Sequence, residues 1–182
     1  MDGRLGGRDA ALRAGHRRAR AHLSDRVHIA VVGPGGRATT EELDAAEEVG
    51  RLLAEAGAVV VCGGLGGVME AACRGARASG GLTLGILPGR DRRDANPHVA
   101  VAVPTGLGEA RNALVVRAAD AVVAVGGAYG TLSEIALALK GGTPVVGLNT
   151  WELARGGAPD AGVVAVHSAA EAARTALDLA HK

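Results

Sequence analysis

The sequence AVVAVGGAYGTLSE, residues 121–134, joins an apolar run to a helical segment through a glycine loop. The apolar run does not alternate with polar residues, which is typical of a strand covered on both faces. Backbone N–H groups at a helix start, reinforced by the helix dipole, bind phosphate without a lysine or a metal. The stretch therefore predicts a βα unit whose loop, Gly126–Thr131, holds an anion beside the Glu134 carboxylate.

The same pattern repeats along the chain from Val27 onward. Strands are expected over 27–32, 58–62, 82–87, 99–103, 121–125, 144–148 and 163–166. Helices are expected over 40–56, 67–79, 108–118, 131–140 and 169–181, the first opening with a capping box at Thr39 and Glu42. Segments 89–97 and 150–161 are rich in charge, glycine and proline and are expected as surface loops, the first reaching over the pocket. The alternation predicts an α/β fold: a doubly wound, mainly parallel Rossmann-like sheet with helices on both faces.

The length of 182 residues and the hydrophobic content of 48% fit one globular domain. We place this Rossmann-like nucleotide-binding domain at residues 26–182, after a basic extension, flexible or helical, at residues 1–25. Residues 1–26 contain seven arginines and three aspartates, but they contain no aromatic residue that could stack on the bases of single-stranded nucleic acid. Nucleic acid is therefore not an expected partner. A membrane span and a secretory signal are not expected either, because apolar runs of the needed length are missing, and we expect a cytoplasmic protein.

Two cysteines, Cys62 and Cys73, fall in apolar contexts and are predicted to be buried thiols. The sequence contains no HExxH or CxxC motif, so no metal site is expected. The six histidines are scattered and are expected to be ordinary surface or core residues.

Two further glycine loops follow predicted strands, at the sheet edge where ligands bind in such folds. The first, with Gly33, Gly35 and Gly36, fits the dinucleotide pattern, but the second strand ends in glycines rather than in the acidic residue that would hold the ribose. A nicotinamide or flavin dinucleotide is therefore not expected. The second loop predicts close approach of backbone to a ligand and contains Gly63, Gly64, Gly66 and Gly67. Glu70 behind it either pairs with ribose hydroxyls or complements the helix dipole.

The third loop carries an ambiguity of its own. Thr131-x-x-Glu134 has the spacing of a capping box, so the residues alone leave Glu134 open between a helix cap and a catalytic carboxylate. Tyr129 is the chain's only tyrosine, and the chain has no phenylalanine. It is either a stacking surface or simply an exposed residue at the tip of the loop.

The segment GGAYGTLSE resembles the PGGxGTxxE signature of the LOG family, also called lysine decarboxylase-like, whose members are phosphoribohydrolases acting on nucleotides. The segment GGLGGVMEAA, residues 63–72, is similar to that family's earlier glycine motif, and GEARN, residues 108–112, occupies the place of its arginine-containing segment. The resemblance spans about residues 27–150. It implies that Arg111 and Glu134 are the catalytic pair and that Gly127, Gly130 and Thr131 bind phosphate.

Three positions depart from the signature: Gly126 replaces its proline, Ala128 replaces its second glycine, and Asn112 replaces the lysine that usually follows the arginine. These departures resemble a neighbouring branch of the superfamily, which includes a molybdenum-cofactor carrier protein. A pyridoxal-dependent decarboxylase is not expected, because the chain has only two lysines, Lys140 and Lys182. No resident cofactor is expected.

The favoured hypothesis is hydrolysis of the N-glycosidic bond of a nucleoside 5′-monophosphate to a free base and ribose 5-phosphate. Glu134 would stabilise oxocarbenium charge or orient water, and Arg111, which stays charged, would clamp phosphate or polarise the leaving base. The alternative is a carrier that binds a nucleotide or the molybdenum cofactor without catalysis. The ligand-binding set is expected to be completed by Asn112, Gly127, Ala128, Tyr129, Gly130 and Thr131. A homo-oligomer, a dimer, is expected from the resemblance and from the apolar helix at residues 135–139.

Overall fold

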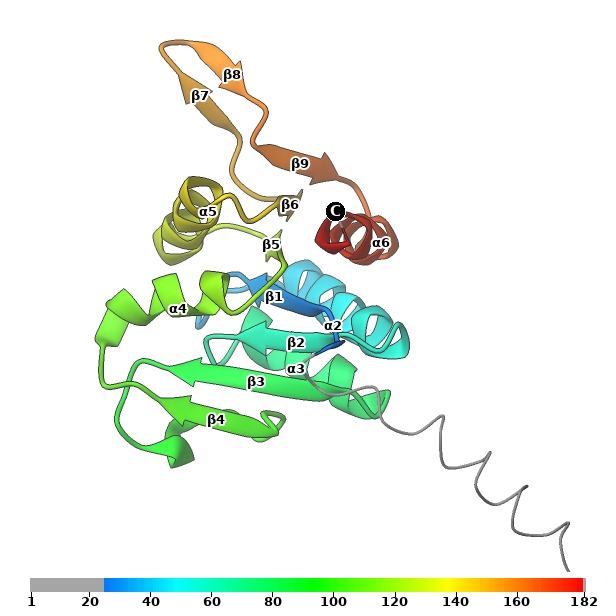
Figure 1. Cartoon of the computed structure of the whole chain (residues 1–182), viewed down its shortest axis with the longest axis vertical. Coiled ribbons are helices and arrows are strands. Elements are labelled where there is room, and N and C mark those ends of the chain that lie inside the picture. Colours follow the sequence, from blue (N-terminus) through cyan, green and yellow to red (C-terminus); the bar gives the residue numbers. More distant parts are fainter. Residues whose placement is uncertain (1–24, 182) are drawn as a thin grey trace, which may run out of the picture.

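The computed structural model describes residues 25–181, so the basic extension predicted over residues 1–25 lies, apart from Asp25, outside the described residues. A seven-stranded parallel sheet forms the centre, in the order β4-β3-β2-β1-β5-β6-β9 (Figure 1). Its strands are β1 (His28–Val32), β2 (Val59–Cys62), β3 (Leu82–Leu87), β4 (Val101–Pro104), β5 (Ala121–Val125), β6 (Val145–Leu148) and β9 (Val163–Val166).

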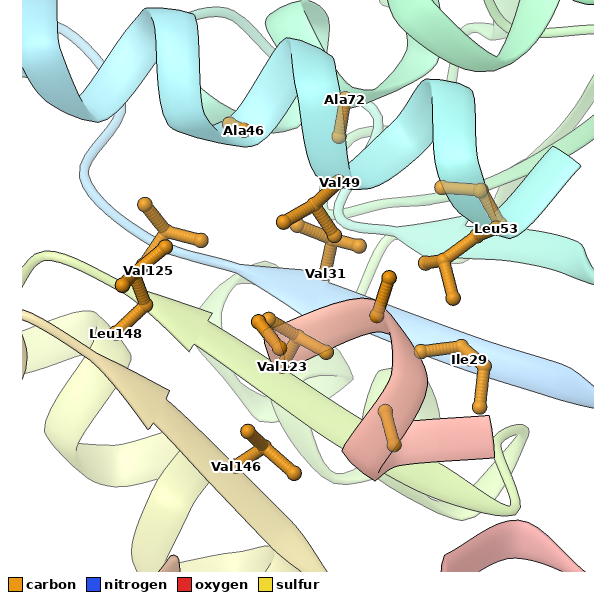
Figure 2. Packing of buried hydrophobic residues seen from close by; sticks show 14 of the residues in the cluster. Ile29, Val31, Ala46, Val49, Leu53, Ala72, Val123, Val125, Val146 and Leu148 are labelled. Carbon is orange, nitrogen blue, oxygen red and sulfur yellow. The ribbon is translucent and has the colours of Figure 1, made fainter. Parts of the chain in front are cut away.

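Helices cover both faces of the sheet and confirm the predicted doubly wound α/β architecture. One face carries α2 (Thr40–Glu55), α3 (Val68–Ala78) and α6 (Ala169–Ala180), and the other carries α4 (Asn112–Arg117) and α5 (Tyr129–Gly141). Side chains of the central strands alternate between the two cores. Figure 2 shows Ile29 and Val31 packed beneath Val49 and Leu53 of α2, whereas Ala30 and Val32 belong to the core under α4 and α5.

The path of the chain changes from one face of the sheet to the other between β1 and β5. The connection after β1 leads to α2 on one face, while the connection after β5 leads to α5 on the opposite face. Ligands of such sheets bind at the carboxyl ends of the strands where the connections diverge. The loops that follow β1, β2 and β5 therefore meet at the expected binding edge.

Three segments differ from their predicted form. The helix expected over 108–118 is divided into a 3₁₀ turn, η4 (Gly108–Arg111), and the short helix α4. The surface loop expected over 89–97 contains the 3₁₀ turn η3 (Arg92–Asp94). The prediction of a loop over 150–161 is wrong. This segment contains an antiparallel hairpin, β7 (Leu153–Arg155) and β8 (Ala158–Asp160), that projects from the body of the protein (Figure 1).

Both cysteines are buried thiols, as predicted, and their Sγ atoms lie 3.4 Å apart between β2 and α3. Among residues 25–181, no helix is long and apolar enough to cross a bilayer. The same residues contain no group of three or more His, Cys, Asp or Glu side chains arranged to hold a metal ion.

Candidate functional site

The start of α5 is an uncapped helix N-terminus. Its N-cap residue, Ala128, has an extended backbone and offers no side-chain hydrogen bond to the helix. The first intrahelical bond runs from the Leu132 N–H to the Ala128 carbonyl, at 2.9 Å. The N–H groups of residues 129–131 precede that bond and have no acceptor within the helix. They form, together with the helix dipole, a site suited to an anion.

Thr131 places a hydroxyl at this helix start. The residue is 2% exposed, and its Oγ1 atom has no hydrogen-bond partner within the described part of the chain. A buried hydroxyl without a partner is costly, and such groups are usually satisfied by a ligand or an ordered water. The capping-box interpretation of Thr131 and Glu134 is wrong, because Thr131 is the third residue of α5 rather than its N-cap.

The Glu134 side chain instead faces Arg111. Glu134 Oε1 lies 3.2 Å from Arg111 Nη1, and each residue is only 6% exposed. Arg111 Nη1 also donates to Asn112 Oδ1 at 2.6 Å. The buried pair thus joins the start of α4 to the first turns of α5.

Asn112 and Ser133 extend this connection to the anion loop. Asn112 Nδ2 donates to Ser133 Oγ at 2.9 Å, and that hydroxyl donates to the Gly130 carbonyl at 2.8 Å. Each side chain in this series of hydrogen bonds depends on the position of the next one. The network therefore fixes the first turn of α5 relative to Arg111.

Burial controls the protonation of Glu134. Removal from water raises the pKa of the Glu134 carboxyl to about 7, and the neighbouring Arg111 charge opposes this rise without cancelling it. The carboxyl therefore changes its charge near neutral pH.

The second glycine loop forms a wall against the same pair. A Cβ atom at Gly63 would lie 2.6 Å from Arg111 Nη2, so a side chain here would displace the guanidinium from its present position. Segment 89–97 contacts this loop, since Asn96 donates through its backbone N–H to the Gly64 carbonyl and through Nδ2 to the Leu65 carbonyl, both at 2.9 Å. At the far end of the loop, Glu70 lies beside Gly66.

The first glycine loop packs against its neighbours. A Cβ atom at Gly33 would lie 2.5 Å from the Val125 carbonyl oxygen, and one at Gly67 would collide with the Gly35 carbonyl. The Val68 N–H, at the start of α3, donates to the Pro34 carbonyl at 3.0 Å. The first loop thus covers the start of α3. Of its glycines, only Gly36 could take a Cβ atom with no neighbouring atom within 4 Å of it.

Trp151 is a site residue that the sequence reasoning missed. It follows β6, and its Nε1–H donates to the Ala128 carbonyl at 3.2 Å. Its indole lies against Gly127, where a Cβ atom would come within 2.8 Å of Nε1, and its ring centroid is 5.7 Å from that of Tyr129. The signal was available, because the chain's single tryptophan lies three residues beyond the carboxyl end of the predicted strand 144–148.

Residues 26–174 match the family model described as SLOG cluster4. The chain belongs to the SLOG cluster4 family. It is 46% identical over 122 residues to an uncharacterized protein of Archaeoglobus fulgidus, an alignment that covers 67% of this chain and 80% of the relative. The predicted resemblance to the LOG superfamily branch that includes cofactor carriers is thereby confirmed.

Solved structures similar to this SLOG cluster4 protein include two that bind or carry the molybdenum cofactor. The molybdenum cofactor binding protein of Rippkaea orientalis is 36% identical, with a TM-score of 0.76 over 85% of this chain and 97% of that one. The molybdenum cofactor carrier protein of Chlamydomonas reinhardtii is 34% identical, with a TM-score of 0.75 over 86% and 99% of the two chains.

Two departures from the LOG signature have local explanations in this SLOG cluster4 protein. Gly126 has a φ of +64°, which proline cannot adopt because its ring fixes φ at about −65°. A Cβ atom at Gly126 would also collide with the Glu42 carboxylate. Asn112, in the place of the lysine, bonds Arg111 and Ser133. The substituted residues thus belong to the structure of the site.

Proposed function

We propose that this protein binds a phosphorylated small molecule as a carrier, with the phosphate at the N-terminus of α5 and the molybdenum cofactor as the cargo. The observation that carries the proposal is the buried Thr131 hydroxyl, which has no hydrogen-bond partner among residues 25–181, at an uncapped helix start. A phosphate oxygen supplies the acceptor that this hydroxyl and the N–H groups of residues 129–131 need. The related cofactor-binding proteins, at 36% and 34% identity, support this class of ligand.

The ion pair of Glu134 favours binding over hydrolysis. A hydrolytic carboxylate must reach the sugar or the attacking water. Glu134 Oε1 is instead held at 3.2 Å by Arg111 Nη1, and the Gly63 backbone lies against the same guanidinium. In this arrangement the pair shapes the wall of the site rather than contacting a ligand.

Hydrolysis of a nucleoside 5′-monophosphate is the second candidate. It is favoured by the pKa of Glu134, about 7, which suits a group that exchanges protons at neutral pH. This function requires the Arg111–Glu134 pair to open when the nucleotide binds.

Calorimetric titration with inorganic phosphate tests the anion site. The Thr131→Val variant removes one hydroxyl with little change of shape, and we expect its phosphate affinity to fall about tenfold or more, as for a lost hydrogen bond to a charged group. Thr39→Val is the matched control, because Thr39 caps α2 and contributes nothing to α5. Equal phosphate affinity in the wild type and Thr131→Val would exclude the proposed site.

The cargo is tested on protein isolated from cells that make the molybdenum cofactor. We expect molybdenum and pterin to co-purify in equal amounts with the wild type and to decrease in parallel in Thr131→Val. Pterin is measured by its fluorescence after oxidation, and molybdenum by mass spectrometry. Phosphate binding without pterin or molybdenum would retain the anion site and reject this cargo.

The two candidate functions are separated by an assay for ribose 5-phosphate. The protein is incubated with a panel of nucleoside 5′-monophosphates, and the carrier proposal expects binding without release. Release that is lost in Glu134→Gln would establish the hydrolase instead.

We further propose that the protein forms a homodimer. Leu114 on α4 and Leu137 on α5 are 40% and 37% exposed, which is unusual for leucines on two helices that pack together. Light scattering of the full chain measures the mass, and a monomer would reject the dimer.

A further inference from the structure

The chain has only two aromatic side chains apart from histidine, one tyrosine and one tryptophan, and they lie together. The core consists of small and branched aliphatic residues, chiefly valine and alanine. Aromatic rings usually contribute to cores, where they bury the largest apolar areas. Here neither ring is placed in the fully buried core, and both flank the anion loop.

Trp151 fixes this flank of the loop. Its Nε1–H donates to the Ala128 carbonyl at 3.2 Å, and Gly127 packs against its indole. The Tyr129 ring leans on the indole with an angle of 35° between the planes, and Tyr129 is 82% exposed. The arrangement presents a tyrosine ring to the outside while the partially buried tryptophan holds it from behind.

We propose that Tyr129, supported by Trp151, is the subsite for a planar heteroaromatic ring of the phosphorylated ligand. This inference rests on the proposed function, because the phosphate at α5 brings the ligand to Tyr129. The N–H of Tyr129 is itself one of the groups at the helix start that have no acceptor within the helix, so a phosphate bound there lies next to the residue that carries the ring. A ring joined to the phosphate by a short sugar-like linker reaches the tyrosine face.

The opposite flank of the loop offers no space for a ring. Arg111 and Glu134 are each 6% exposed, and Gly63 lies against the guanidinium. On the aromatic flank, Trp151 also lines a groove of about 470 Å³, together with Asn149 and Thr150 among others, and this groove begins behind Tyr129 rather than in the anion loop itself. This volume lies in the range of small-molecule sites.

The groove also provides polar groups for the edge of a heterocycle. Thr150 Oγ1 is buried and has no hydrogen-bond partner among the described residues. Asn149 adopts a φ of +50°, a conformation that is uncommon outside glycine. Thr150 and Asn149 thus offer polar side chains along the groove, next to the tryptophan that supports Tyr129.

Three probes separate the ring subsite from the phosphate site: inorganic phosphate, ribose 5-phosphate and guanosine 5′-monophosphate. We expect the wild type to bind guanosine 5′-monophosphate about tenfold more tightly than ribose 5-phosphate, as aromatic stacking on a base provides. Trp151 is the only tryptophan, so its emission reports binding at this position. The nucleotide should change that emission more than ribose 5-phosphate does.

Tyr129→Ala removes the ring and keeps the backbone N–H. We expect it to lose the tenfold preference for the nucleotide while its affinity for ribose 5-phosphate stays within about twofold, and Tyr129→Phe to restore the preference. Val101→Ala, at an exposed position on the far edge strand β4, is the control for loss of an exposed side chain.

The outcomes distinguish a failure of the ring subsite from a failure of the phosphate site. A wild type that binds ribose 5-phosphate and guanosine 5′-monophosphate equally would reject the ring subsite and leave the phosphate site intact. A preference that persists in Tyr129→Ala would also reject it. A wild type that binds none of the three probes would overturn the proposed function together with the subsite.

Discussion

Two helices of this protein carry the same four-residue pattern, Thr-x-x-Glu, at or near their starts and use it differently. At α2, the Thr39 hydroxyl accepts from the Glu42 N–H at 3.2 Å, and the Glu42 carboxylate accepts from the Thr39 N–H at 2.8 Å. At α5, the Thr131 hydroxyl has no partner in the described chain, and Glu134 faces Arg111. The first start satisfies two N–H groups through its own side chains, whereas the second has no side-chain cap.

The difference originates in where each helix begins. Thr39 is the N-cap of α2, but α5 begins at Tyr129, so Thr131 already lies inside the helix. The two helix starts also differ in the charge of their first turns. The first turn of α2 contains Glu41 and Glu42, while the first turn of α5 contains no acidic residue. An acidic, capped start stabilises the fold, and an uncapped start without acidic residues is suited to an anion.

The largest expected effect comes from removing the Arg111 guanidinium, which pairs with the buried Glu134 carboxyl. Arg111→Met leaves a buried carboxyl without its partner, and we expect a loss of about 3–5 kcal/mol in the free energy of unfolding at about pH 8. Urea denaturation measures the loss. The exposed Arg37, near the start of α2, provides the control Arg37→Met, for which we expect a change below about 0.5 kcal/mol. A comparable loss in both variants would show that the pair has no special role.

The second effect is a pH dependence that belongs to α5 alone. Burial raises the pKa of Glu134 to about 7 from an ordinary value of 4.5. A raised carboxyl pKa stabilises the fold below the unfolded value, and this contribution is lost as pH rises through the folded value. We expect the wild type to lose about 3 kcal/mol relative to Glu134→Gln between about pH 4 and pH 8. Denaturation of both proteins across this range measures it, and a difference that grows in the opposite direction would contradict the burial argument.

A third effect tests the contact between the two helix starts. Gly126 has a φ of +64° and lies against the Glu42 carboxylate, so Gly126→Ala introduces both backbone strain and a collision. We expect a loss of about 1–3 kcal/mol in unfolding free energy. Gly130→Ala is the matched control, since a Cβ atom there has no neighbour within 4 Å and φ is not positive. An unchanged stability in Gly126→Ala would mean that Glu42 moves away without cost.

The sequence predicted the sheet well because the apolar runs are long, uninterrupted and rich in valine. It failed at residues 150–161, where strands of three residues are too short to show alternation and are mostly exposed. It also left the role of Glu134 undecided between a helix cap and a catalytic carboxylate, because Thr-x-x-Glu has the spacing of a capping box and also occurs in the family signature. The start of α5 at Tyr129 excludes the cap, and the Arg111 that Glu134 faces instead is placed by the division of the predicted helix into η4 and α4.

The candidate site was predicted unevenly for a similar reason. The residues within one loop, Gly127–Thr131, follow from local pattern, because a strand, glycines and a helix occur in succession. The pairing of Arg111 with Glu134 came from the resemblance to a family rather than from spacing. Trp151 was missed, because its contact with Ala128 crosses from the end of one parallel strand to the next. Contacts between neighbouring strands depend on the sheet order, which local pattern does not contain.

The smallest effect separates stability from binding at the two threonines. Thr39→Val removes the cap of α2, and we expect a loss of about 1 kcal/mol in unfolding free energy. Thr131→Val removes a buried hydroxyl without a partner, so we expect no loss or a slight gain. A ligand that binds only the folded state raises stability according to its affinity. Saturating phosphate should therefore stabilise the wild type and Thr39→Val equally and Thr131→Val less, as thermal denaturation would show. If phosphate stabilised all three proteins alike, the two helix starts would differ in geometry and not in function.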